Sequence, residues 1–267
     1  MKLPYARSGS APGAVVLVHG WFAAGPVWEA VRAGLDASER SVIVPELRGA
    51  GRAEAFRGPY DAATTAADLG ETLDAAGIDS AVLVAHSMSA RAALLLAARE
   101  PARVASVVAV APVPPQGLDF DERARQLYRA ALADDEALAS LIGVLSGRRY
   151  PRAWARAEAG LARRAMSGDA ARGYLHDFVE NDVSAGVEGL SVPVLALCGD
   201  ADPAMTPAFV GEALAPLCPR LSVRTLPGCT HYPMREAPLP LAAAVNVWCT
   251  DGDRPGGSPL SRERGRP

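Results

Sequence analysis

A short apolar run that changes abruptly into a helix-forming segment constrains this chain more than any other stretch. Residues 82–85 form the apolar run, and the Ala- and Leu-rich segment from Ala90 onward has high helix propensity. The change falls at Ser87. A strand that turns sharply into a helix holds the residue at the turn in a strained conformation, beside the first free N–H groups of the helix. Such a turn suits a nucleophile whose reaction places an oxyanion next to it.

Apolar runs and amphipathic segments alternate along the first 110 residues and again after residue 190. Buried strands are predicted at residues 14–18, 41–45, 81–85, 104–110, 192–198 and 221–226, after at most one short strand near residues 3–7. Helices are predicted at residues 27–35, 64–76, 90–99, 206–217 and 240–249. This alternation is typical of a mostly parallel sheet with right-handed crossovers. The sequence therefore predicts an α/β fold with helices on both faces of the sheet.

The alternation stops between residues 116 and 189. This segment contains no convincing strand, and helices are expected at residues 121–132, 136–145, 151–166 and 169–179. We therefore expect a core made of residues 1–115 and 190–250, with an all-helical cap at 116–189 inserted after the strand that ends near Val110. Residues 251–267 lack any apolar period, so we expect a disordered tail.

The cap carries an apolar stripe at helical spacing. Most of its members are expected to pack the cap onto the sheet, and a minority to line a pocket. The stripe consists of Leu127, Leu138, Leu141, Ile142, Leu145, Trp154, Leu161, Tyr174 and Phe178.

Four motifs resemble those of the α/β-hydrolase superfamily, in the same order along the chain. Residues 85–89 (AHSMS) resemble the nucleophile elbow G-x-S-x-G, with alanine and serine in place of the glycines. Residues 18–21 (VHGW) resemble the oxyanion loop of esterases and cofactor-free perhydrolases of this superfamily. Residues 199–202 (GDAD) resemble the acid loop G-x-x-D, and residues 228–238 resemble G-x-x-H-x-P-x-x-E-x-P. The resemblance implies an α/β-hydrolase fold from about Val15 to Val247.

The resemblance also implies the roles of a catalytic triad. Ser87 corresponds to the nucleophile, His231 to the base and Asp202 to the acid that orients the base. Asp200 is the alternative acid, and otherwise a loop or helix-cap acceptor.

The same resemblance implies an oxyanion hole made by the backbone N–H groups of Trp21 and Met88. Phe22 either contributes to substrate binding or only fills apolar space. Arg91, just inside the helix after the elbow, is expected to form a salt bridge rather than to bind a substrate carboxylate.

The expected reaction is hydrolysis of a carboxylic ester, lactone or thioester of a small to medium apolar substrate, through an acyl-enzyme. Three alternatives stay open, because the same triad serves them: a C–C bond hydrolase, a biosynthetic thioesterase or cyclase, and a non-catalytic ligand-binding member of the fold. Dehalogenases and epoxide hydrolases of this superfamily have aspartate as the nucleophile. This sequence has Ser87 at that position, so these two classes are set aside. Lys2 is the only lysine, so the active-site lysine of hydroxynitrile lyases is missing.

Composition limits the kinds of partner and the cellular location expected for this 267-residue chain. A formal charge of −3 argues against a nucleic-acid surface, and no apolar run approaches the ~20 residues of a membrane span. The N-terminus lacks a signal-peptide pattern, and the four cysteines show no C-x-x-C spacing. We expect a cytoplasmic protein that acts on a small molecule, with no cofactor, no metal, and no nucleic-acid or membrane partner. The oligomeric state is not readable from the sequence.

Overall fold

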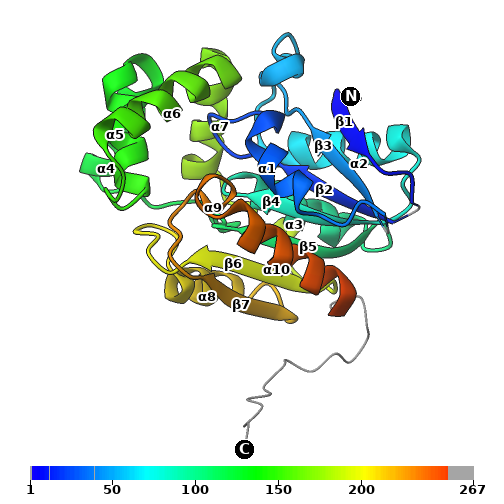
Figure 1. Ribbon diagram of the computed structural model, residues 1–267. Coiled ribbons are helices and arrows are strands. Elements are labelled where there is room, and N and C mark those ends of the chain that lie inside the picture. Colours follow the sequence, from blue (N-terminus) through cyan, green and yellow to red (C-terminus); the bar gives the residue numbers. More distant parts are fainter. Residues whose placement is uncertain (1, 12, 39, 252–267) are drawn as a thin grey trace, which may run out of the picture.

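The computed structural model describes residues 2–11, 13–38 and 40–251, which form a twisted sheet between layers of helices (Figure 1). Within these ranges seven strands make one sheet in the order β1-β3-β2-β4-β5-β6-β7. The strands are β1 Tyr5–Ser8, β2 Ala14–Val18, β3 Ser41–Pro45, β4 Ala81–His86, β5 Val104–Val110, β6 Val194–Gly199 and β7 Leu221–Leu226. β1 pairs with β3 antiparallel, and all the other neighbours are parallel. The predicted α/β fold with a mostly parallel sheet is confirmed.

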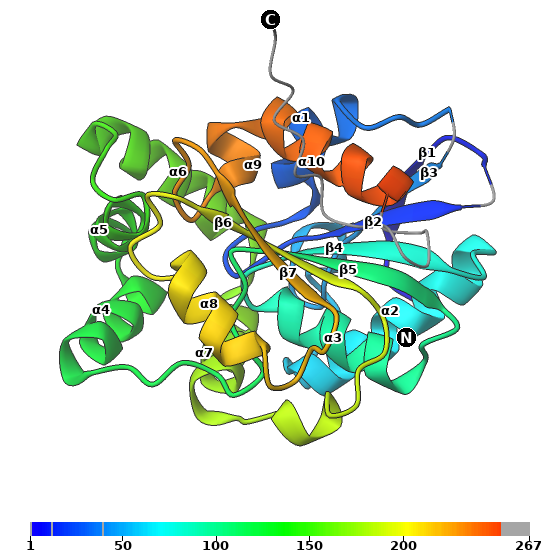
Figure 2. The same cartoon turned by 90° about the horizontal axis from the view of Figure 1, so that it is seen from below.

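Helices cover both faces of this sheet (Figure 2). Helices α2 (Ala62–Ala76), α3 (Ser89–Arg99) and α8 (Pro207–Leu214) lie on one face, and α1 (Glu29–Ala33), α9 (Pro233–Glu236) and α10 (Pro238–Asp251) lie on the other. Side chains alternate along a strand, so neighbours enter different cores. In β2, Val16 packs with α2 and α3, whereas Leu17 packs with α1 and α10. Every residue of β2, β3 and β4 is consequently buried.

The segment between β5 and β6 forms a group of helices at the carboxyl end of the sheet (Figure 1). It contains α4 (Glu122–Ala133), α5 (Asp135–Leu145), α6 (Arg152–Ala165) and α7 (Gly168–Glu180), followed by the short 3-10 helix η3 (Ser184–Gly186). Three of these helices begin at a side chain that accepts a backbone N–H: Asp121 for α4, Asp134 for α5 and Ser167 for α7. We refer to α4–α7 as the cap.

Two predicted helices differ from the observed ones. In place of one helix at 27–35, the structure has a 3-10 turn η1 (Gly25–Trp28) followed by the short α1. At Gly34, just after α1, the backbone lies against α10. A Cβ built on Gly34 would be only 2.9 Å from the Cβ of Ala242. The helix expected at 206–217 ends at Leu214, because Pro216 has no N–H with which to continue it.

Two further expectations concern membrane-spanning helices and the C-terminal tail. None of the helices in the described ranges is long and apolar enough to cross a membrane. The tail predicted to be disordered lies outside the described residues, apart from Asp251 at the end of α10.

Candidate active site

Ser87 occupies the sharp turn between β4 and α3. Its φ is +54°, in the left-handed region that a residue with a side chain rarely adopts. The turn is held from both sides, because the Ser87 N–H donates to Val110 O at 2.9 Å and its C=O accepts from Val113 N at 3.1 Å. Ala85 and Ser89, which replace the elbow glycines, are both buried. The hydroxyl of Ser89 donates to the C=O of His19 at 2.5 Å.

The structure brings Ser87, His231 and Asp202 together. His231 Nε2 lies 3.2 Å from Ser87 Oγ, and its Nδ1 lies 3.0 Å from Asp202 Oδ2. The other oxygen of Asp202 accepts the N–H groups of Ala204 and Met205 at 2.8 and 3.0 Å. Burial opposes ionisation of Asp202, but the imidazole and these N–H groups outweigh it and hold its pKa below the usual value. A carboxylate at this position orients Nδ1–H toward itself and leaves Nε2 to accept the serine proton.

Asp200, the alternative acid, does not contact His231. Its Oδ1 accepts the N–H of Gly228 at 2.8 Å, which fastens the loop that leads to His231. Asp200 is therefore the loop acceptor considered for it, and Asp202 is the carboxylate that contacts the imidazole.

Two side chains fix the loop that carries His231: the carboxylate of Glu236 and the imidazole of His86. Glu236 accepts both the N–H and the hydroxyl of Thr230, one residue before His231. The Nε2 of His86 lies 2.9 Å from the C=O of His231, so Nε2–H is the donor there. Burial, followed by the charge of His231, lowers the pKa of His86 to about 3. His86 is thus a neutral donor that supports the loop.

Trp21 and Met88, whose N–H groups are the predicted oxyanion donors, flank the turn. Neither N–H donates a hydrogen bond to another residue that the structure describes. The loop of Trp21 lies against the elbow, since a Cβ on Gly20 would be only 2.5 Å from Nδ1 of His86. The Trp21 ring is tied to the cap, because its Nε1–H donates to Ala171 O at 2.7 Å.

Phe22 fills apolar space and also lines the neighbouring cavity. It is buried and has a φ of +52°, so its backbone is strained in the same sense as that of Ser87. Its ring lies 4.5 Å from the Trp21 ring, and the Arg163 guanidinium lies 5.1 Å from its centroid.

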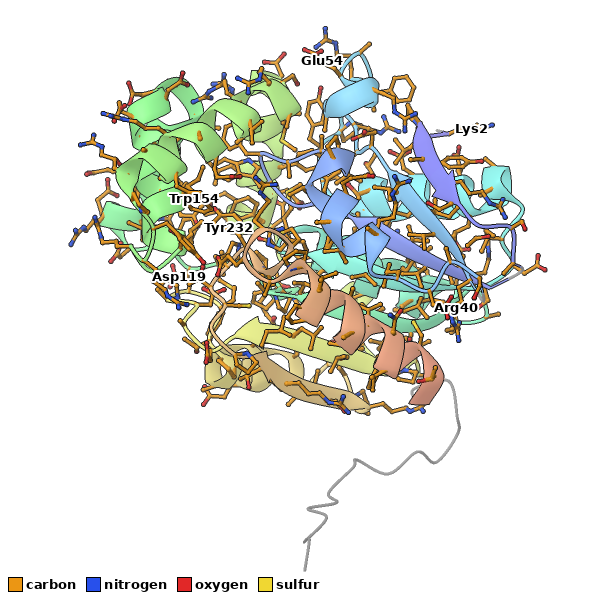
Figure 3. All side chains as sticks on the ribbon, viewed as in Figure 1. Lys2, Arg40, Glu54, Asp119, Trp154 and Tyr232 are labelled. Atoms are coloured by element: carbon orange, nitrogen blue, oxygen red, sulfur yellow. The ribbon has the colours of Figure 1, made fainter. Side chains whose placement is uncertain are left out.

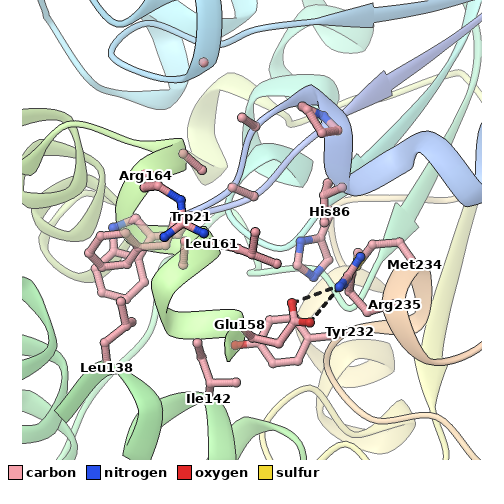
Figure 4. A pocket seen from close by; sticks show the side chains of 18 of the residues that line it. Trp21, His86, Leu138, Ile142, Glu158, Leu161, Arg164, Tyr232, Met234 and Arg235 are labelled. Atoms are coloured by element: carbon pink, nitrogen blue, oxygen red, sulfur yellow. Dashed lines mark hydrogen bonds and ion pairs between the residues drawn. The ribbon is translucent and has the colours of Figure 1, made fainter. Parts of the chain in front are cut away.

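A cavity of about 610 Å³ lies between α5, α6 and the core (Figure 4). Ser87 and His231 are not among its lining residues. The cavity borders them through His86 and Tyr232, whose rings lie 5.1 and 5.3 Å from the His231 ring. Trp154 of the cap and Tyr232 of the core, both labelled in Figure 3, line this cavity from its two sides.

Most of the cap's apolar stripe packs against the core as expected, since eight of its nine members belong to the buried core cluster or pack against it. The expectation that only a minority lines a pocket is wrong. Six of its nine members line the cavity, because α5 and α6 stand away from the sheet edge and leave the space between them and the core open. These six are Leu138, Leu141, Ile142, Leu145, Trp154 and Leu161.

Arg91 forms the predicted salt bridge. Its Nη1 lies 2.6 Å from Asp177 of α7, and both residues are buried. This pair joins the elbow helix to the cap. Within the described ranges, no cluster of three or more His, Cys, Asp or Glu side chains could hold a metal ion.

Comparison with known proteins places the chain in a family. The family model for the alpha/beta hydrolase fold matches residues 13–238, so the chain belongs to the α/β-hydrolase family. The non-heme chloroperoxidase of Burkholderia pyrrocinia is 29% identical over 235 aligned residues, and the match covers 81% of this chain and 84% of that protein. The protein of the same name from Streptomyces lividans is 30% identical over 233 residues, with the same coverage. An esterase from Exiguobacterium antarcticum superposes with a TM-score of 0.80 at 16% identity, covering 92% of this chain and 94% of its own.

Proposed function

We propose that this protein is a serine hydrolase that cleaves carboxylic esters through Ser87, His231 and Asp202. The observation that carries the proposal is the continuous relay from the serine hydroxyl through the imidazole to the buried carboxylate, with distances of 3.2 and 3.0 Å. Membership of the α/β-hydrolase family and the likeness to solved esterases support it.

The relay serves a two-step acyl transfer. Ser87 Oγ attacks the ester carbonyl carbon while His231 Nε2 takes its proton, and the oxyanion is held by the N–H groups of Trp21 and Met88. The tetrahedral intermediate collapses, the C–O bond to the alcohol breaks, and His231 gives its proton to the departing oxygen. Water then attacks the acyl-enzyme with His231 again as base, and the acid and free Ser87 are released. Asp202 stabilises the imidazolium in both steps.

The cavity indicates the kind of ester that fits. A volume of about 610 Å³ is within the usual range of small-molecule sites, and leucine, isoleucine and tryptophan side chains form much of its wall. A small to medium apolar acyl or alcohol group is the ligand such a wall accepts. Lactones and thioesters of similar size fit the same chemistry.

Replacing the nucleophile tests the proposal. The wild-type protein and Ser87→Ala are compared on p-nitrophenyl esters of graded chain length, with lactones and thioesters alongside. We expect turnover to fall on the order of 10⁴-fold in Ser87→Ala, with an unchanged Tm. Full esterase activity in a folded Ser87→Ala protein would remove the proposed mechanism.

A second candidate follows from the name of two relatives, the non-heme chloroperoxidases of Burkholderia pyrrocinia and Streptomyces lividans. If hydrogen peroxide replaces water in the second step, its oxygen attacks the acyl-enzyme, and a peracid and free Ser87 are released. Peracid formation from an ester and hydrogen peroxide, measured beside hydrolysis, separates the two reactions. A peracid yield that Ser87→Ala abolishes would support this candidate, and no peracid above the uncatalysed rate would contradict it.

A further inference from the structure

Two arginines lie at one rim of the large cavity, where the end of α6 meets the 3-10 turn η2 (Gly51–Ala53). Arg52 and Arg164 both line the cavity. The two segments are held together by an antiparallel bridge between Ala50 and Met166, with Ser167 N donating to Gly49 O at 2.8 Å. Residue 52 follows the bridge by two positions and residue 164 precedes it by two. Arg52 and Arg164 thus reach the cavity from two segments that this bridge joins.

The positive charge of this rim is only partly compensated, because Glu46 is the one carboxylate beside the two arginines in this part of the cavity lining. Arg164 has no ion pair or hydrogen bond with any residue in the described ranges, and Figure 4 shows its guanidinium extending from α6 beside Leu161. The carboxylate nearest to Arg52 is that of Glu46, at 3.8 Å. That carboxylate is already held by the Gly25 N–H at 2.8 Å.

The other charged pair in the cavity wall neutralises itself. Glu158 of α6 receives two hydrogen bonds from Arg235 of α9, of 2.6 and 3.1 Å (Figure 4). The cavity thus combines apolar walls, the closed Glu158–Arg235 pair, and a rim where Arg52 and Arg164 exceed the charge of Glu46 by one positive unit. A purely apolar ligand would leave that rim without a partner.

We propose that Arg52 and Arg164 form an anion subsite of the active site, and that the preferred substrate is an ester whose apolar chain ends in a carboxylate. This inference rests on the proposed function. Guanidinium groups bind carboxylates through charge-assisted, often bidentate, hydrogen bonds. The apolar chain lies along the cavity wall, and its terminal carboxylate reaches the rim.

A matched pair of substrates tests the subsite. p-Nitrophenyl hexanoate and mono-p-nitrophenyl adipate have the same acyl length and differ in whether the chain ends in a methyl group or a carboxylate. We expect wild-type kcat/KM to favour the adipate by about tenfold, a preference that falls as salt screens the exposed arginines. In Arg52→Gln/Arg164→Gln the preference disappears, mainly through KM, because the contact is remote from the reacting carbonyl.

Arg99→Gln/Arg123→Gln is the control, since both arginines are exposed, neither lines the cavity, and the double variant loses the same two charges. It keeps the wild-type preference. Equal kcat/KM values for the two esters in the wild-type protein, or an equal loss of preference in the control, would overturn the subsite.

A binding measurement separates this inference from the proposed function. Monomethyl adipate and methyl hexanoate are titrated calorimetrically into Ser87→Ala, with and without the two arginine substitutions. We expect the adipate to bind about tenfold more tightly, and only when the arginines are present. Equal binding of the two ligands overturns the subsite even if neutral esters are hydrolysed. If the binding preference holds while no ester is hydrolysed by the wild-type protein, the subsite stands and the esterase proposal fails.

Discussion

The hydroxyl of Ser89 donates a hydrogen bond to the backbone C=O of His19. Ser89 is the last residue of the elbow and the first of α3, and His19 follows the end of β2. The bond therefore joins the two segments that carry Met88 and Trp21, the proposed oxyanion donors. The serine that departs from the family's glycine at this position adds a contact that glycine cannot make.

Replacing this serine is expected to loosen the oxyanion site. Ser89→Ala leaves the buried C=O of His19 without its partner, which costs about 1–3 kcal/mol of stability. We also expect kcat on a p-nitrophenyl ester to fall by about tenfold, because the two N–H donors lose their fixed separation. Urea unfolding and steady-state kinetics measure both effects. Ser140→Ala, in an exposed turn of α5, is the control and changes neither by much. Unchanged stability and kcat in Ser89→Ala would contradict this role.

The two aspartates of the acid loop are expected to respond differently to the same substitution. Asp202→Asn keeps the side-chain shape but favours the wrong tautomer of His231, so kcat falls on the order of 10³- to 10⁴-fold. Asp200→Asn retains an oxygen for the Gly228 N–H and stays within a few-fold of the wild-type protein. Steady-state kinetics on one ester decide the matter, and the assignment is wrong if Asp200→Asn shows the larger loss.

Stability is expected to depend on pH through His86. Its pKa is about 3 in the folded protein and 6.5 when unperturbed, so the unfolded chain binds the extra proton between these values. The contribution of His86 to the free energy of unfolding is fully present above pH 6.5. It is lost as the pH falls toward 3, by at most about 1.4 kcal/mol per pH unit.

His86→Gln removes this contribution, so its unfolding free energy should fall less steeply than that of the wild-type protein between pH 6.5 and about 4.5. Urea unfolding at several pH values gives the two slopes. His176→Gln, at an exposed position of α7, should keep the wild-type slope. Parallel slopes for the wild-type protein and His86→Gln would refute the prediction.

The buried pair of Arg91 and Asp177 is expected to be costly to break. Arg91→Met leaves the carboxylate of Asp177 buried without its cation, and removing one member of such a pair costs about 3–5 kcal/mol. Arg152→Met, which breaks a solvent-exposed pair with Glu136, should cost far less, because water screens that pair. Urea unfolding compares the two, and equal costs would show that the Arg91 pair does not anchor the cap.

Local signals account for the parts of the site that were predictable from the sequence. The elbow at Ser87 shows in the change from an apolar run to a helix-forming segment, and the acid and histidine loops each follow an apolar strand. The relay distances among Ser87, His231 and Asp202 agree with the arrangement that these motifs imply. Their catalytic roles stay a prediction.

Contacts between distant segments could not be predicted in the same way. A salt bridge was expected for Arg91, but its partner Asp177 is 86 residues away and has no motif. The Glu158–Arg235 pair joins α6 to α9, and the Ala50–Met166 bridge joins the η2 loop to the end of α6. The number of stripe residues at the cavity was misjudged for the same reason, because periodicity shows which cap side chains are apolar but not which of them also face a cavity.

Labelling with a fluorophosphonate probe tests the central claim most directly, because the probe reacts with a serine only when a base activates it. The relay predicts a single adduct, mapped by mass spectrometry to Ser87 in the folded protein. It also predicts no adduct in Ser87→Ala, and strongly slowed labelling in His231→Gln. No adduct at Ser87 in the folded wild-type protein, or labelling as fast in His231→Gln, would contradict the account and favour a ligand-binding protein on the same fold.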